Sequence, residues 1–480
     1  MDLHVRLDGA GDLTAQLYRE LRAAVRDGRL RAGDRLPASR ELATRLEVSR
    51  GTVTQAYERL VAEGFLTARV GAGTFVAEIA PEGATRGRRR PGAVRPRSTW
   101  TFGPSPVGTD GEVTYDFRVG VPDPELFPFD VWRRLVAAEL RLGANTPGRY
   151  ADPAGHAGLR AAVARHVGVS RSVRCDLEDV LVTNGTQHAL DLVTRVFLEP
   201  GDTVAVEEPG YPPAATLLEA SGMRVVPVPV DAEGLVVDRL PPRTRLVYTT
   251  PSHQFPLGVA MSLGRRMALS QWADHHDALV IEDDYDSEFR FTSRPLEPLV
   301  NLDPSGRVCY IGSFSKTMLP SVRLGFVVAP ASLRSALRAA RQLTDGHSPP
   351  ATQAALARFI DEGLLARHVR KAAGAYATRH GAVLGALGEV PGVRLVPSTA
   401  GLHVCAHLPG APAGAGRRVV AAARRADVAV EALADYYRDP SAQGSAIEGL
   451  VVGYGAVGSG RVDEGLRRLV AVLRREANAS

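Results

Sequence analysis

The chain of 480 residues is long enough for two or more domains, each with a sizeable core. Its 45% hydrophobic and 23% charged residues exclude an intrinsically disordered chain. The net charge of +5 is a mild basic bias, which weakly indicates a nucleic-acid partner. Three cysteines stand far apart without a C-x-x-C pair, which argues against a disulfide framework or a zinc site and fits a reducing compartment. Without a signal-peptide core or a bilayer-length apolar run, the sequence predicts a soluble cytoplasmic protein.

Residues 1–77 carry the pattern of three short helices and a hairpin. Apolar residues recur at helical spacing from Thr14 to Val25, a second helix is expected over 39–46 with Ser39 as its N-cap, and a third over 50–61. An alternating stretch at 65–70, a Gly71-Ala-Gly73 turn and residues 74–76 predict a β-hairpin. Two helices, a tight turn and a hairpin wing are what a winged helix-turn-helix requires.

The third helix is expected to present a polar face suited to a DNA groove. Arg50, at its start, can reach base edges or phosphate, and hydroxyl groups nearby can bond backbone oxygens. The candidate DNA-binding residues are Ser39, Arg40, Ser49, Arg50, Thr52, Thr54 and Tyr57. On helical pattern alone, a small protein-interaction module with solvated arginines is the alternative.

Four runs in this segment resemble the GntR-type winged helix. They are Leu36-Pro-Ala-Ser-Arg-Glu-Leu-Ala43, Val48-Ser-Arg-Gly-Thr-Val53, Glu63-Gly-Phe-Leu66 and Gly71-Ala-Gly-Thr-Phe-Val76. The resemblance covers the whole segment in order and implies binding to double-stranded operator DNA.

Residues 78–112 predict a flexible linker. Proline, glycine and a cluster of arginines replace any apolar periodicity there. The arginines are interpreted as part of a solvated tether, with salt-sensitive contacts to DNA phosphate as the sharper alternative.

Residues 113–480 alternate β-branched runs with helical stretches, as a doubly wound α/β domain does. Functional groups in such a sheet lie just past the carboxyl ends of the strands. The expected buried strands are 180–183, 203–206, 246–248, 278–281 and 308–311.

The residues after the first three strands are suited to hold a flat, phosphorylated ligand. Gly185, Thr186 and Gln187 open a helix whose N–H groups can hold a phosphate. Tyr211, on a proline-rich turn, can stack on a ring, and His253 can hydrogen-bond a ring oxygen. Each signal is weak alone, since helix starts and packed tyrosines are common.

The fourth strand is followed by the acidic run Glu282-Asp-Asp-Tyr-Asp-Ser-Glu288. A carboxylate there can pair with a protonated pyridine nitrogen. A cation loop built from Asp283, Asp284 and Asp286 is the alternative, although the glycine and terminal glutamate of a calcium loop are missing.

The fifth strand leads to Lys316, one of only two lysines in a chain that otherwise uses arginine for positive charge. A lysine amine can form a Schiff base with an aldehyde, which a guanidinium cannot do. Ser313, Ser315 and Arg323 are placed to bind phosphate. An aldehyde with a phosphate tail would use all these groups, and pyridoxal 5'-phosphate (PLP) fits that description.

The Ser-x-Ser-Lys run and Arg323-Leu-Gly-Phe326 resemble the fold-type I aminotransferases, with the likeness running from about Asp116 to the C-terminus. The resemblance implies that Lys316 forms the internal aldimine, Asp283 pairs with the pyridine nitrogen and Tyr285 hydrogen-bonds the ring hydroxyl. It also implies that Tyr211 stacks on the ring. The implied phosphate-binding residues are Gly185, Thr186, Gln187, Ser313, Ser315 and Arg323.

Joined to the winged helix, the whole chain resembles the MocR-like transcriptional regulators. That resemblance implies a head-to-tail homodimer whose aminotransferase-like domain senses PLP or its adduct with an amino compound. Two departures from aminotransferases stand out: Gly449–Gly455 has no Arg to bind a substrate carboxylate, and Phe255 and Leu257 replace the Asn and Thr of the Asn-Pro-Thr-Gly motif.

The sequence therefore predicts a PLP-responsive transcription regulator, with vitamin B6 or amino-compound metabolism as the field it controls. A working aminotransferase with a DNA-binding appendage is the alternative, and a scaffold that binds neither ligand is a third. Loss of the carboxylate contact, of roughly 1.5–3 kcal/mol, disfavours efficient transamination. A residual half-reaction stays open.

Overall fold

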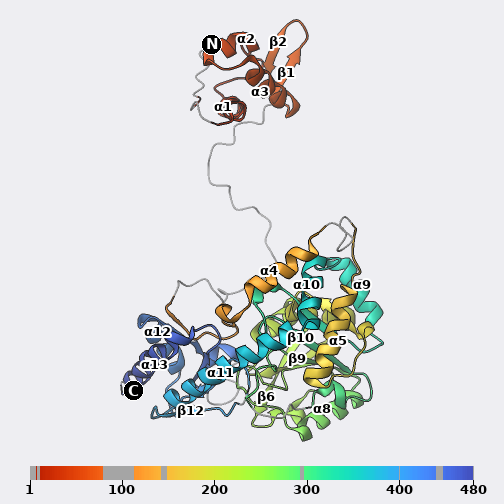
Figure 1. Cartoon of the computed structure of the whole chain (residues 1–480), viewed down its shortest axis with the longest axis vertical. Coiled ribbons are helices and arrows are strands. Elements are labelled where there is room, and N and C mark those ends of the chain that lie inside the picture. The colour runs from red at the N-terminus through yellow and green to blue at the C-terminus, as the bar shows by residue number, and fades with distance from the viewer. Residues whose placement is uncertain are drawn as a thin grey trace. The chain divides into compact units, whose positions relative to one another are not determined.

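The computed structural model describes residue 7 and residues 11–78, 113–141, 149–291, 297–398, 400–438 and 447–478. The chain divides into two compact units, Met1–Arg97 and Ser98–Ser480 (Figure 1). Beyond residue 78, the predicted linker lies outside the described residues.

The first unit is a winged helix, as predicted. It contains α1 (Leu13–Arg26), α2 (Ser39–Leu46), α3 (Arg50–Ala62) and the antiparallel pair β1 (Leu66–Arg69) and β2 (Gly73–Val76). Its core joins all three helices to the hairpin through side chains such as Leu21, Leu42 and Leu60, none of which is exposed. Amphipathic helices of this length are stabilised mainly by such packing.

The start of α2 differs from the prediction. Ala38 is the N-cap and Ser39 is the first helical residue, without a side-chain bond to the helix. The capping serine belongs instead to α3, where Ser49 Oγ accepts a hydrogen bond from the Thr52 N–H at 3.1 Å.

The second unit is built on an eight-stranded sheet in the order β4-β11-β10-β9-β8-β5-β6-β7. Neighbouring strands from β10 to β6 run parallel, whereas β11 is antiparallel to both of its neighbours and β7 to β6. The strands are β4 (Val180–Thr183), β5 (Thr203–Glu208), β6 (Arg224–Asp231), β7 (Gly234–Leu235), β8 (Thr244–Thr249), β9 (Leu279–Asp284), β10 (Val308–Ser313) and β11 (Gly325–Val328).

Helices cover both faces of this sheet because its strands are apolar on both sides. Alternate strand residues pack on α6, α7 and α9 on one face and on α5, α8 and α10 on the other. The helices are α4 (Phe129–Glu139), α5 (Ala157–Arg171), α6 (Thr186–Phe197), α7 (Pro212–Ala220), α8 (Leu263–His275), α9 (Arg334–Thr344) and α10 (Pro350–Asp361).

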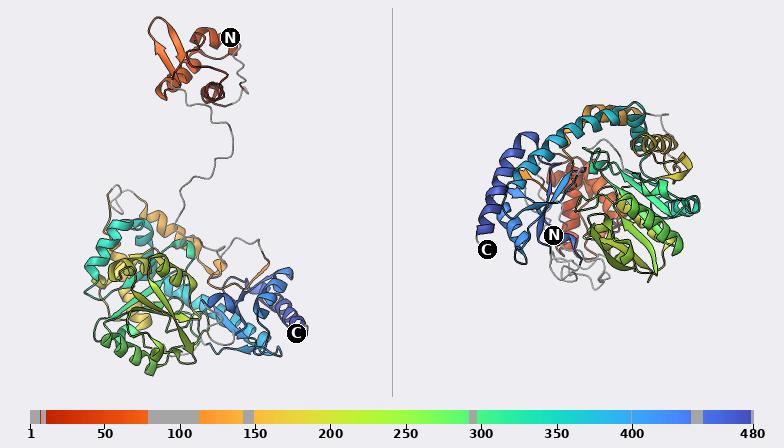
Figure 2. Two further views of the ribbon diagram at one scale, coloured as in Figure 1. Left: turned by 180° about the vertical axis from the view of Figure 1, so that it is seen from behind. Right: turned by 90° about the horizontal axis from the view of Figure 1, so that it is seen from below.

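A smaller lobe completes the unit. Its sheet has the order β12-β13-β16-β15, and β14 pairs with β3 in parallel. Figure 2 shows this lobe, in blue, gathered on one side of the large sheet. Its elements are β3 (Tyr115–Asp116), α11 (Leu364–Gly388), β12 (Arg394–Leu395), β13 (His403–His407), α12 (Ala415–Arg425), β14 (Val428–Ala429), β15 (Glu431–Ala432), β16 (Gly449–Gly453) and α13 (Val462–Asn478).

The architecture confirms the predicted α/β fold of the large domain and all five expected strands. No helix among the described residues is long and apolar enough to cross a membrane. The parallel strands end at one edge of the sheet, which is where the candidate site is built.

Candidate functional site

Lys316 lies just past the carboxyl end of β10, in a half-buried position. Its Nζ donates a hydrogen bond to the Gly120 carbonyl oxygen. Burial lowers the pKa of the Lys316 amine, and the negative charges of Asp286 and Asp283 oppose that effect. A lysine with a lowered pKa is a better nucleophile at neutral pH.

Asp283, near the end of β9, is 3% exposed. Its Oδ2 accepts a hydrogen bond from the Tyr248 hydroxyl at 2.5 Å, while Oδ1 has no hydrogen-bond partner among the described residues. Burial raises the pKa of Asp283 to about 7. A buried carboxylate oxygen without a hydrogen-bond donor destabilises the folded protein. We therefore expect a bound ligand to donate to Asp283 Oδ1.

The neighbours of Asp283 point elsewhere. Asp284 lies on the opposite face of the strand, where Arg171 Nε donates to it at 2.6 Å and Tyr310 adds a second bond. Asp286 is held by His253. Since the three aspartates have separate partners, the alternative of a cation loop built from them is wrong.

A cup of hydrogen-bond donors forms at the start of α6. Gly185 is the N-cap residue, with a φ of 93° that favours glycine, and Thr186 and Gln187 begin the helix. Arg323 Nη2 donates to the Asn184 carbonyl oxygen at 2.6 Å, which brings its guanidinium to this helix end. The combination of helix N–H groups and a guanidinium suits a phosphate.

The two serines before Lys316 close the other side of the cup. Ser313 Oγ donates to Ser315 Oγ at 3.0 Å and accepts from the Ser315 N–H at 3.1 Å. Ser313 pairs with Gly325 on β11, and Gly325 pairs with Thr183 on β4, so this loop and the start of α6 adjoin across the sheet.

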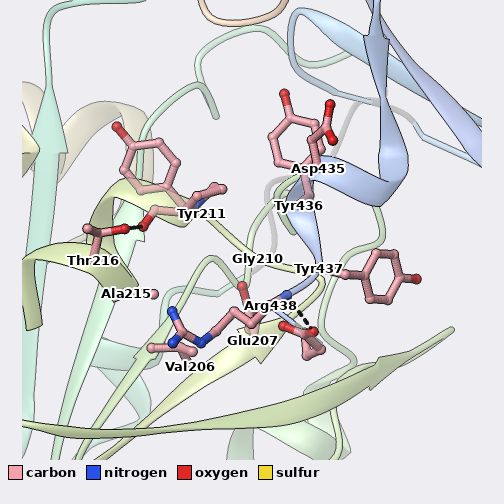
Figure 3. A pocket seen from close by; sticks show the side chains of 12 residues that line it. Val206, Glu207, Gly210, Tyr211, Ala215, Thr216, Asp435, Tyr436, Tyr437 and Arg438 are labelled. Carbon is pink, nitrogen blue, oxygen red and sulfur yellow. Dashed lines mark hydrogen bonds between the residues drawn. The ribbon is translucent and has the colours of Figure 1, made fainter. Parts of the chain in front are cut away.

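Tyr211 belongs to an aromatic cluster centred on Phe255. The Phe255 ring meets the rings of Tyr211, Tyr285 and Tyr436 edge to face, at centroid distances of 5.7, 5.9 and 5.2 Å. A cavity of about 220 Å³ lies beside Tyr211 and Tyr436. Figure 3 shows that two separate segments form its wall, one carrying Tyr211 and the other running from Asp435 to Arg438.

His253 differs from the prediction that it bonds a ring oxygen. Its Nδ1 lies 3.0 Å from Asp286 Oδ2 and its Nε2 lies 3.0 Å from Ser398 Oγ, so both ring nitrogens have protein partners. The Tyr285 hydroxyl donates to the His253 carbonyl oxygen at 3.0 Å. His253 therefore holds Tyr285 in place, and its imidazole is not free for a ligand.

His253 and Asp286 also lie close to His403, with ligand-type atoms within 4.8 Å of one another. His403 Nε2 is bonded to the Pro256 carbonyl oxygen at 3.1 Å. Because these nitrogens already have partners, we interpret the group as a packed hydrogen-bond network.

The candidate DNA-binding residues lie around α2 and α3. Arg40, Ser49 and Arg50 are exposed, whereas Ser39, Thr52 and Thr54 are partly buried. Thr54 Oγ1 donates to the Arg50 carbonyl oxygen at 3.0 Å.

Tyr57 is the exception to this set. It is 7% exposed, it packs in the core of the first unit, and its hydroxyl donates to the Pro37 carbonyl oxygen at 3.0 Å. Its position on the inner face of α3 makes it a packing residue, which corrects its placement among the DNA contacts.

Two family models match the chain, one to each unit. Bacterial regulatory proteins of the gntR family match residues 13–76, and aminotransferase class I and II matches residues 121–439. The chain is 41% identical over 370 residues to a protein named probable rhizopine catabolism regulatory protein MocR from Rhizobium meliloti, covering 76% of this chain and 75% of the relative. It belongs to the MocR-like transcriptional regulators.

Two further relatives match over most of their length. TauR, an HTH-type transcriptional regulator of Rhodobacter capsulatus, is 34% identical and covers 97% of each chain. PdxR of Corynebacterium glutamicum, named as a pyridoxine biosynthesis transcriptional regulator, is 34% identical and covers 82% of each. Both matches extend over four fifths or more of this chain.

Among solved structures, LysN of Thermus thermophilus resembles the second unit, with a TM-score of 0.68 and 32% identity. The match covers 77% of this chain and 94% of LysN, an α-aminoadipate aminotransferase complexed with N-(5'-phosphopyridoxyl)-L-leucine. An enzyme and this MocR-like chain thus share one fold, and side chains must distinguish them.

Three site features of the MocR-like chain escaped sequence reasoning. Gly120 holds the Lys316 amine, Tyr248 holds Asp283, and Glu431 lies on the small lobe near Lys316. Tyr248 had a signal, because it ends a predicted strand beside the one that carries Asp283. Nothing in the sequence relates residues 120 and 431 to Lys316, since the tertiary fold alone brings them together.

Proposed function

We propose that the large unit of this regulator binds PLP as its effector, attached through Lys316, and that the winged helix binds operator DNA. The unpartnered Asp283 Oδ1 carries the proposal, because a protonated pyridine nitrogen would supply the missing donor. PLP brings an aldehyde that a primary amine can attack. The lowered pKa of Lys316 supports that amine as the point of attachment.

The rest of the pocket has the parts that such a ligand needs. Gly185, Thr186 and Gln187 would bind its phosphate through backbone N–H groups, together with Ser313, Ser315 and Arg323. The Tyr285 hydroxyl, which here donates to the His253 carbonyl oxygen, would turn to donate to the ring oxygen, and Tyr211 would lie against the ring. Burial raises the pKa of the Tyr211 hydroxyl, so it stays a neutral donor.

We propose sensing in preference to turnover. The strand β16 contains no arginine that could orient an amino-acid carboxylate, and the named relatives are regulators. An active aminotransferase with a DNA-binding appendage is the second candidate, favoured by the likeness to LysN. Regulation of vitamin B6 or amino-compound metabolism is suggested by the names of PdxR and MocR.

We also propose that the protein works as a head-to-tail homodimer. Large apolar side chains on and beside α4 are exposed, including Phe129 at 54% and Leu140 at 70%. Exposed apolar side chains of this kind are typical of a surface that a partner chain covers. Sedimentation equilibrium of the full chain tests this, and a monomer at micromolar concentration would reject it.

The cofactor claim is tested by replacing each of the two lysines. Lys316→Ala is expected to remove the visible absorbance of PLP-treated protein and its borohydride-stable label, because the attached amine is lost. Lys371→Ala, at an exposed position on α11, is the matched control and should retain both. A wild-type protein that takes up no PLP would reject the proposal, and rapid turnover of an amino donor with a keto acid would promote the second candidate.

The DNA claim is tested at the start of α3. Arg50→Ala is expected to weaken binding to a promoter fragment by about tenfold or more, with a smaller dependence on salt. Arg29→Ala, on the exposed turn after α1, is the control. Unchanged footprints for Arg50→Ala would reject the assignment of α3 as the recognition helix.

A further inference from the structure

One carboxylate on the small lobe, that of Glu431, acts on the charge of the Lys316 amine, and it has no place in the proposed binding of PLP. Glu431 begins β15 and pairs directly with Val451 on β16. Paired residues of an antiparallel ladder project from the same face of the sheet. On that face Val451 packs with Leu257, Cys405 and Leu433, so Glu431 is a single acid beside an apolar wall.

A two-residue turn connects this acid to Lys316. The Val119 N–H donates a hydrogen bond to the Glu431 carboxylate, and the Gly120 carbonyl oxygen accepts one from Lys316 Nζ. Val119 and Gly120 are adjacent in the chain, so the Glu431 carboxylate and the Lys316 amine are hydrogen-bonded to neighbouring residues of one short segment. Gly120 has a φ of 86°, in the left-handed region that favours glycine, and a Cβ there would come 3.0 Å from Lys316 Nζ.

The surroundings leave the acid suited to a cation. The Tyr436 hydroxyl donates to Glu431 Oε2, and Arg118, the nearby guanidinium, is turned toward Asp116 at 2.6 Å. Asp116, Arg118 and Glu431 together carry a formal charge of one negative unit. Burial raises the pKa of Glu431, with Tyr436, Val119 and Arg118 acting in the opposite direction, so a second cation would be favoured there.

We propose that the Lys316 pocket selects an amine that carries a second cationic group, such as an α,ω-diamine, and that Glu431 binds the far ammonium. The inference rests on the proposed function, because the near amine is the one that meets the cofactor. The apolar wall at Leu257 and Val451 would contact the carbon chain between the two nitrogens.

The geometry disfavours the other two kinds of amine. An ω-amino acid of the same length would place its carboxylate beside Glu431, where like charges repel and β16 offers no arginine. A monoamine would bury a methyl group against the carboxylate and add no cation beside the acid. A diamine satisfies the carboxylate and the apolar wall together.

The test uses full-length PLP-loaded protein and three matched ligands: 1,5-diaminopentane, pentylamine and 5-aminopentanoate. Calorimetry and the visible absorbance of the bound cofactor give each apparent dissociation constant. The diamine is expected to bind about tenfold or more tightly than either comparator, as a charge-assisted hydrogen bond allows. Glu431→Gln keeps the size of the side chain and should abolish that preference, whereas Glu389→Gln, at the exposed end of α11, should keep it.

The outcomes separate this inference from the proposed function. Protein that takes up no PLP refutes the proposed function, and the inference falls with it. Loaded protein that binds all three ligands equally, or that prefers 5-aminopentanoate, overturns the diamine preference alone. A diamine preference that persists in Glu431→Gln overturns the role of Glu431.

Discussion

Asp283 illustrates how a single side chain can carry more functional information than the pattern around it. Its neighbours Glu282 and Asp284 are equally buried acids, yet both have partners from the protein: the Leu299 and Val300 N–H groups for Glu282, and Arg171 for Asp284. Only one Asp283 oxygen has a partner. The acid that the fold leaves incomplete is the one expected to bind a ligand.

The pKa of Asp283 gives a prediction about stability. Burial raises it from 3.8 to about 7, so the folded state holds the proton more tightly than the unfolded chain does. The contribution of this group is complete below pH 3.8 and is lost as the pH rises through about 7. The Asp283→Asn variant has no ionisable group at this position. As the pH rises from about 5 to about 8 without PLP, its free energy of unfolding should therefore fall by about 1–3 kcal/mol less than that of wild type.

Urea unfolding of the second unit at the two pH values measures this difference. The exposed Asp130→Asn, on α4, is the control and should follow wild type. PLP should bind Asp283→Asn at least about tenfold more weakly, because a neutral amide oxygen accepts a weaker hydrogen bond from a protonated pyridine nitrogen than a carboxylate does. Equal pH dependence in Asp283→Asn and wild type would show that the Asp283 carboxyl is not held protonated by burial.

At the scale of elements, the site depends on how closely β4, β11 and β10 meet. Gly325 opens β11 between the ends of the other two strands. A Cβ there would come 2.9 Å from both Gly185 Cα and the Gly312 carbonyl oxygen. The start of α6 and the Ser313 loop can adjoin only because this position has no side chain.

Gly325→Ala should therefore separate the two halves of the phosphate cup. We expect a loss of about 1–3 kcal/mol in the stability of the second unit, as overpacking against backbone produces, and weaker binding of PLP. Gly381→Ala is the matched control, because a Cβ at that position on α11 meets nothing within 4 Å. Helix propensity predicts a neutral or stabilising effect there. Thermal unfolding and PLP titration measure both effects. Equal stability and equal PLP affinity in Gly325→Ala and Gly381→Ala would contradict the role of Gly325.

Sequence patterns predicted the elements well and the contacts between them less well. The buried strands and the residues just past their ends follow from hydrophobic runs and the rule for parallel sheets, which is why Lys316, Asp283 and Arg323 could be named. His253 and Tyr57 were misplaced because periodicity does not show which polar atoms find partners inside the protein. Glu431 was missed because β15 and its turn partner Val119 are far apart in the sequence.

At the scale of the whole molecule, two units with separate cores raise the question of how one ligand changes the behaviour of the other unit. Each unit has its own apolar cluster, such as that of Leu60 in the winged helix and that of Val452 in the small lobe. Separate cores predict separate unfolding transitions. Coupling between effector and operator would then be a free energy that either ligand exerts equally on the other.

Calorimetry of the full chain tests this arrangement. Leu60→Ala removes a fully buried side chain from the first unit. It should lower the free energy of unfolding for one transition by about 2–5 kcal/mol. PLP at a hundred times its dissociation constant should raise the free energy of unfolding for the other transition by about 2.7 kcal/mol. The transition lowered by Leu60→Ala should not respond to PLP unless the units stabilise each other. If PLP instead shifts both transitions, and if Lys316→Ala abolishes that effect, the two units are thermodynamically coupled even without DNA.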